Sequence, residues 1–339
     1  MFEIAGGARR AELMHPFASR HAEFDGFSEF FDQEVRPKLS ERDEVRSKAV
    51  RRGLISAGFT FILIFGGSLL ALLHFDNPPA AFVLFGLSIM GAFFVFGAIT
   101  DDIRTETKDR IVNAIVGYIG WHFDPDVRSY DVTDFKDLFL LPKKIDRMSF
   151  EDSLSGTAHG ASFRSVEAHL EKETRDSDGD RSWDTVFRGQ LMKLDFPTKT
   201  FGRTIVLRDK GWFNSKKQSD MKRIGLVDPV FEKIFEAYGT DQVEGRVILD
   251  PAFMQRMVDL EKAVSGKNIR FGFDRDTLFI AVETKDQFEA GSMFKSLTSP
   301  DRTQKILDEV GAVFDIVDTL LKRKKRRHCR TEFNLATPR

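Results

Sequence analysis

Two long apolar stretches constrain this chain more than any other feature. They cover residues 53–75 and 80–100, and neither contains Lys, Arg, Asp or Glu. At 1.5 Å per helical residue, each would form a helix of roughly 30–34 Å, which is long enough to cross the hydrocarbon core of a membrane. A segment within lipid must satisfy its own backbone hydrogen bonds, so both stretches are predicted to be α-helices. Because only residues 76–79 separate them, the two helices must run antiparallel as a transmembrane hairpin.

Basic residues flank this hairpin on both sides. Lys48, Arg51 and Arg52 precede the first stretch, Arg104 follows the second, and the link at 76–79 has neither Lys nor Arg. Positively charged flanks stay on the cytoplasmic side of a membrane. We therefore expect a multi-pass membrane protein with both termini in the cytoplasm. The single cysteine, Cys329, suits such a reducing compartment.

The hairpin divides the chain into four predicted parts. These are an N-terminal cytoplasmic helical segment (1–52), the hairpin (53–100), a cytoplasmic domain (101–321) and a basic disordered tail (322–339). In the first part Phe24, Phe27, Phe30 and Phe31 recur at a spacing of three and four, which is typical of one face of a helix. The bilayer surface or a partner would accept such a stripe, but packing against the protein's own soluble domain is the simpler interpretation.

The sequence of the cytoplasmic part predicts a sheet with flanking helices. Apolar residues alternate with polar ones at 166–170, 192–196 and 269–273, and short apolar runs lie within 203–208 and at 278–282. Alternation at this spacing, with Asp and Gly at the turns, indicates an antiparallel sheet, and the last two segments are predicted to form a hairpin turning at 274–276. Helices are predicted at 135–141, at 251–264 and from about Pro300 to Leu321. The expected fold class is α+β, with N-terminal helices and a two-helix transmembrane hairpin followed by a cytoplasmic antiparallel-sheet domain.

Composition and motifs argue against several kinds of site. The balance of 51 basic and 52 acidic residues argues against a nucleic-acid-binding protein. The Asp-rich stretch at 176–180 suggests a calcium loop, but the sixth and twelfth positions are Arg181 and Phe187 instead of Gly and Glu. The seven His residues show no metal-ligand spacing, and no glycine-rich phosphate loop is present. We therefore predict no metal, no cofactor and no catalytic residues, and an enzyme is the less favoured class.

One short segment is denser in chemistry than the rest of the chain. Asp241, Gln242, Glu244 and Arg246 lie within six residues, just before a predicted strand and the helix that starts at Pro251. The two acids would flank a ligand, with the guanidinium of Arg246 holding an anion. The alternative is a turn whose charges pair locally.

Several short motifs carry a resemblance to a known family. They are Phe187-Arg188-Gly189, Phe201-Gly202-Arg203-Thr204, Phe231-Glu232-Lys233-Ile234-Phe235, Tyr238-Gly239-Thr240-Asp241-Gln242-Val243-Glu244 and Leu249-Asp250-Pro251. In this order they resemble the bacterial membrane-protein family catalogued as domain of unknown function 3137. The resemblance implies a location in the bacterial inner membrane and the company of LemA-type membrane proteins. It implies no activity and no catalytic residues.

The chain ends in a dense basic run. Its members are Lys322, Arg323, Lys324, Lys325, Arg326 and Arg327. A nearby anionic membrane would attract these side chains, whereas a solvated tail needs no partner. Three functions therefore stay open: a membrane-anchored binding or scaffold module for a protein partner, a membrane-bound enzyme with its site at 241–246, and a sensor of anionic lipid that uses the basic run.

Overall fold

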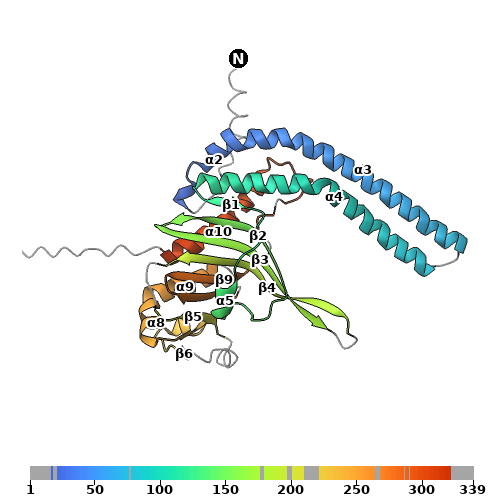
Figure 1. The fold of residues 1–339 in the computed structure, drawn as a ribbon. Helices are drawn as coiled ribbons and strands as arrows, with labels where there is room; N and C mark the ends of the chain where they lie inside the picture. The colour runs from blue at the N-terminus through green and yellow to red at the C-terminus, as the bar shows by residue number, and fades with distance from the viewer. Residues whose placement is uncertain are drawn as a thin grey trace, which may run out of the picture.

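The computed structural model describes residue 17 and residues 21–75, 78–175, 179–196, 201–209, 221–263, 268–285, 287–289 and 291–321. Within these residues the fold is α+β, as the sequence predicts: long N-terminal helices precede an antiparallel sheet (Figure 1). The helical elements are η1 (Ala22–Phe24), α2 (Phe27–Phe30), η2 (Phe31–Val35), α3 (Arg36–Phe75), α4 (Pro78–Tyr118), α5 (Thr133–Asp137), α7 (Pro229–Glu232), α8 (Gln242–Ile248), α9 (Pro251–Ala263) and α10 (Pro300–Leu321).

The two apolar stretches lie in α3 and α4, which run side by side and extend well beyond the sheet (Figure 1). Near their far end the hydroxyl of Ser68 donates a hydrogen bond to the carbonyl of Ala81 at 2.7 Å. At the near end Gly53 packs against Phe96 and Ile99. By length and composition alone, both helices are suited to cross a membrane. We call residues 53–100 of this pair the arm.

In the part of the chain that the structure describes, the sheet contains nine strands, all paired antiparallel, in the order β1-β2-β3-β4-β9-β8-β5-β7-β6. The strands are β1 (His122–Asp124), β2 (Arg147–Ala158), β3 (Ala161–Arg175), β4 (Arg181–Asp195), β5 (Thr204–Arg208), β6 (Lys222–Arg223), β7 (Phe235–Gly239), β8 (Arg270–Asp274) and β9 (Thr277–Glu283). The predicted hairpin is confirmed, because Asp274 pairs with Thr277 across the turn between β8 and β9.

Apolar layers cover both faces of this sheet. On one face, side chains such as Phe163 and Leu194 pack against α9, α10 and residues 101–118 of α4, which form its inner half. On the other face, Val166, Leu170 and Leu191 pack against the segment 127–141. Alternate residues of a strand point to opposite faces, so the alternating pattern here serves two buried layers. We call the sheet, its covering segments and the inner half of α4 the body.

The N-terminal phenylalanine stripe is part of this core. Phe24, Phe27 and Phe31 are buried, and they belong to the same apolar cluster as Ile111 and Ile115 of α4. The ring of Phe27 lies 5.4 Å from that of Tyr118. Of the two interpretations of the stripe, packing against the protein's own body is the one that the structure supports. Residues from both sides of the arm therefore share one core.

Two local predictions differ from the structure. The segment after Asp241 was expected to lead into a strand, but it forms helix α8. Its buried residues Gly245 and Ile248 are three apart, while Val243 and Val247 are exposed, which is a helical pattern. The short helix predicted at 135–141 is α5, which ends at Asp137.

Candidate functional site

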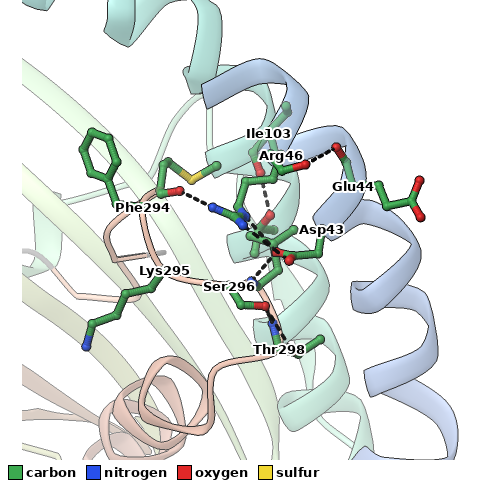
Figure 2. Close-up of polar contacts among 12 residues, drawn as sticks. Asp43, Glu44, Arg46, Ile103, Phe294, Lys295, Ser296 and Thr298 are labelled. Atoms are coloured by element: carbon green, nitrogen blue, oxygen red, sulfur yellow. Dashed lines mark hydrogen bonds and ion pairs between the residues drawn. The ribbon is translucent and has the colours of Figure 1, made fainter. Parts of the chain in front are cut away.

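A cluster of polar contacts joins α3 to the loop that precedes α10 (Figure 2). Arg46 donates a hydrogen bond from Nη1 to the carbonyl of Met293 at 2.7 Å. Asp43 accepts the backbone N–H of Leu297 at 2.8 Å, and it also accepts Nε of Arg46 at 2.7 Å. Two side chains one turn apart on α3 thus hold a loop that lies some 250 residues away in the sequence.

Charge and burial make this contact firm. The side chain of Arg46 is only 12% exposed. Partial burial acts to raise the pKa of Asp43, but the hydrogen bonds from Arg46 and from Leu297 outweigh it and lower that pKa. Behind the loop, Arg302 donates to the carbonyl of Ser292 at 2.7 Å. The loop is therefore fixed from the side of α3 and from the side of α10.

A buried ion pair ties the inner half of α4 to the sheet. Lys108 Nζ lies 2.6 Å from Asp152 Oδ2, and the side chain of Asp152 is 1% exposed. Asp152 has a positive φ of 53° and sits where the pairing of β2 with β3 shifts register. Burial raises the pKa of Asp152 to about 6, although the nearby Lys108 works in the opposite direction. Burial also raises the pKa of Asp109, the next residue on α4.

Further ion pairs surround the same region. Glu106 of α4 accepts Nη2 of Arg42 at 2.6 Å and Nη2 of Arg110 at 2.8 Å, which links α4 to α3. Arg104 forms an ion pair with Glu289, in the loop after β9. We call residues 42–46, 104–109, 152, 289 and 291–298 the junction. Its contacts hold α3, α4, the sheet and the loop together.

A groove of about 870 Å³ lies beside the junction, between the first turns of α3 and the inner half of α4. Phe30, Val35 and Leu39 form its apolar wall, and Glu34 and Asp102 are among its acidic lining residues. The Oδ1 atom of Asp109, also in the lining, is buried and accepts no hydrogen bond from the described residues. The groove thus combines an apolar wall with polar groups, which is the usual composition of a binding surface.

The predicted ligand residues lie together at the opposite end of the body. Asp241 caps α8 by accepting the backbone N–H groups of Val243 and Glu244 at 2.8 and 3.0 Å. Glu244 accepts two further backbone N–H groups, those of Phe201 and Gly202, both at 2.7 Å. Both carboxylates therefore hold backbone groups of this chain.

The other two members of that set lie on the same helix. Gln242 donates from its side chain to the carbonyl of Arg223 at 3.0 Å. Arg246 is exposed in the last turn of α8. The structure thus brings Asp241, Gln242 and Glu244 together around local backbone, with Arg246 beside them. Their role in binding a ligand stays a prediction.

Two other predictions concern the basic run and metal binding. The basic run from Lys322 to Arg327 lies outside the described residues, so its proposed contact with lipid stays a prediction. Within the described residues, no three His, Cys, Asp or Glu side chains cluster in a way that would hold a metal ion.

Sequence reasoning missed the junction. Asp43 and Arg46 have the spacing of an ordinary surface pair on a helix. Only their position shortly before the apolar stretch could have suggested a structural role for them. Asp152 carried no signal, since its neighbours give no indication of a bulge.

Comparison with known protein families finds a match to a family whose function is unknown. Residues 185–322 match the family described as "Protein of unknown function (DUF3137)". This is the family that the motifs of that part of the chain resemble. No curated protein matches the chain.

Among solved structures, the chain is similar to the crystal structure of the mycobacterial trehalose monomycolate transport factor A, TtfA. The identity is 11%, the match covers 62% of this chain and 96% of that chain, and the TM-score is 0.29. A similarity this low carries no argument about the fold or the function.

Proposed function

We propose that this protein is a membrane-anchored module whose arm spans the bilayer and whose body binds a protein partner at the cytoplasmic face. The observation that carries the proposal is the exposure of the arm. Large apolar side chains such as Phe82, Phe93 and Phe94 are 77%, 74% and 76% exposed. Soluble proteins rarely expose continuous apolar surface of this extent, whereas lipid accommodates it.

The orientation follows from the charges at the near end of the arm. Lys48, Arg51 and Arg52 lie on α3 just before the arm, and Arg104 lies on α4 just after it. These side chains would meet the cytoplasmic headgroups, with the body below them and both termini in the cytoplasm. The resemblance to a bacterial membrane-protein family supports the inner membrane as the location.

The groove and the junction support a binding or scaffold role for the body. The groove opens close to the end of the arm, so its occupant would approach along the membrane surface. The junction fixes the groove relative to the arm through hydrogen bonds and ion pairs. We therefore propose that the partner is another membrane protein, and a LemA-type protein is a specific candidate.

The anchor is tested by removing the arm. Because Gly53 packs against Phe96 and Ile99, residues 52 and 101 are close enough for a short Gly/Ser linker to replace residues 53–100. The shortened protein should leave the membrane fraction and stay in solution with its sheet intact by circular dichroism. If it stays with the membranes and the basic run at 322–327 does not account for this, the arm is not the anchor.

The groove is tested by site-specific photo-crosslinking in native membranes. A photoreactive amino acid replaces Asn113, an exposed residue of the groove, and in a matched control it replaces the exposed Val227 on the far side of the body. A discrete adduct with one membrane protein from position 113, but not from 227, is the expected result. Identical products from both positions, or none from either, would contradict a partner site in the groove.

A further inference from the structure

One exposed aromatic side chain of the body lies against the arm. Phe294, in the loop before α10, is 63% exposed. Its ring stacks on that of Phe96, with the centroids 5.2 Å apart and the planes 8° from parallel. Phe96 belongs to the apolar stretch at 80–100, one turn from its end. Phe294 is therefore level with the first turn of the arm.

The loop presents Phe294 outward in a fixed position. Its neighbours Met293 and Leu297 are 6% and 0% exposed, so they belong to the core. The contacts of Arg46 with Met293 and of Asp43 with Leu297 hold the backbone on either side of Phe294 (Figure 2). The loop could bury the ring of Phe294 only by releasing the contacts of Met293 and Leu297. The exposure of this ring therefore follows from the way the loop is held.

Exposed basic side chains, each paired with a nearby carboxylate, lie near the same level of the molecule. Lys295 directly follows Phe294 and its side chain is 65% exposed. Lys48 on α3 is 72% exposed and Arg104 on α4 is 47% exposed. An apolar ring next to exposed Lys and Arg side chains is the composition of a surface that enters the interface of an anionic membrane.

We infer that Phe294 inserts into the cytoplasmic leaflet beside the arm and gives the body a second contact with an anionic lipid surface. This inference rests on the proposed membrane-spanning arm. It adds that the loop at 291–298 touches lipid, and that this contact fixes the tilt of the body over the membrane. The occupant of this surface is lipid, because the ring continues the apolar surface of the arm itself.

The test places a fluorescent label at single cysteines of the full-length protein. In a Cys329→Ser background, Phe294→Cys, Phe93→Cys and Val227→Cys are each labelled with an environment-sensitive fluorophore. Each protein is reconstituted in vesicles of phosphatidylcholine and phosphatidylglycerol with brominated acyl chains, which quench fluorophores in contact with lipid. We expect strong quenching at position 93, roughly half as much at 294, which lies in the interface, and little at 227.

The outcomes separate this inference from the proposed function. Quenching at 93 with none at 294 would leave the arm in the membrane and overturn the lipid contact of the loop. Loss of quenching at both positions would overturn the membrane-spanning arm as well. Equal quenching at 294 and 227 would also contradict the inference, since it would mean that the body touches lipid over its whole surface and not specifically at Phe294.

Discussion

The outer and inner halves of α4 are parts of one continuous helix, yet their apolar side chains have opposite environments. In the outer half Phe93 and Phe94 are about three-quarters exposed, whereas in the inner half Ile111, Val112 and Ile115 are fully buried. The outer half is apolar on every side, and the inner half is apolar only on the face that meets the body. Apolar side chains of one helix thus have two environments. In our proposal lipid surrounds those of the outer half, and the protein core surrounds those of the inner half.

This difference decides what each half tolerates. A charge on the buried face of the inner half has to be paired inside the protein, as Lys108 is paired with Asp152. A charge in the outer half would be costly only if lipid surrounds it.

The largest effect is expected from an acidic residue in the inner half. Ile111→Asp places an unpaired carboxylate in the core, and we expect a loss of more than about 4 kcal/mol in the free energy of unfolding, so that the body does not fold. The matched variant Phe93→Asp should leave thermal unfolding of the detergent-purified body unchanged. It should instead reduce insertion into membranes, because a centrally placed Asp costs about 3 kcal/mol.

Circular dichroism and extraction of membranes at alkaline pH measure the two effects separately. An unfolded body in Phe93→Asp would mean that the outer half packs against protein instead of lipid. A folded body in Ile111→Asp would mean that the inner half is not a core helix.

The next effect concerns the buried partner of Asp152. Lys108→Met leaves the carboxylate of Asp152 buried without its counter-charge, and we expect a loss of about 3 kcal/mol at neutral pH. For a body of this size, such a loss lowers the melting temperature by roughly 6–12 °C. The control, Lys48→Met, removes an exposed lysine and should leave the melting temperature nearly unchanged. Equal effects of the two variants would contradict a structural role for the buried pair.

Asp152 also makes the stability depend on pH. Its pKa of about 6 in the folded protein lies above the ordinary value of 3.8, so the folded state binds the proton more tightly than the unfolded state. The stabilisation is complete below about pH 4 and is lost as the pH rises through about 6. Relative to Asp152→Asn, the wild-type protein should lose about 3 kcal/mol in total once the pH is well above 6.

Melting temperatures of both proteins across this pH range measure the difference. Asp126→Asn is the control, because the side chain of Asp126 is 83% exposed. A constant difference between the wild-type protein and Asp152→Asn would show that Asp152 does not titrate in this range.

The smallest effect on the melting temperature is expected at α8, at the end of the body opposite the arm. Asp241→Ala removes the cap of α8 and should cost about 1 kcal/mol, or roughly 2–4 °C in the melting temperature. Asp241→Asn should cost less, because Asn caps helices as well as Asp. A variant that loses partner adducts with an unchanged melting temperature would instead favour the predicted ligand role of Asp241.

The sequence predicts those parts of the molecule that depend on local pattern. The uninterrupted apolar stretches predict the paired helices of the arm, and the alternation at 166–170 and the short apolar run at 278–282 predict strands of the sheet. The helix that starts at Pro251 follows from its cap, since Asp250 accepts the backbone N–H of Phe253. In each case neighbouring residues contain the full signal.

The junction could not be predicted because its partners are distant in sequence. Arg46 binds a carbonyl at residue 293, and Lys108 binds an aspartate that a strand bulge turns inward. Nothing in the residues around Asp43 indicates that a loop near residue 297 will donate a hydrogen bond to it. Likewise, the helical pattern at 242–248 is short enough to be mistaken for the start of a strand.

The central claim, that the arm spans the membrane with the body in the cytoplasm, is tested most directly by labelling single cysteines in intact bacterial cells. Full-length proteins with Cys329→Ser carry either Asn77→Cys, in the link between the two helices, or Val227→Cys, on the exposed surface of the body. A membrane-impermeant maleimide added from outside should label position 77 at once and position 227 only after the inner membrane is permeabilised. Labelling of position 227 in intact cells, or protection of position 77 until permeabilisation, would contradict the account.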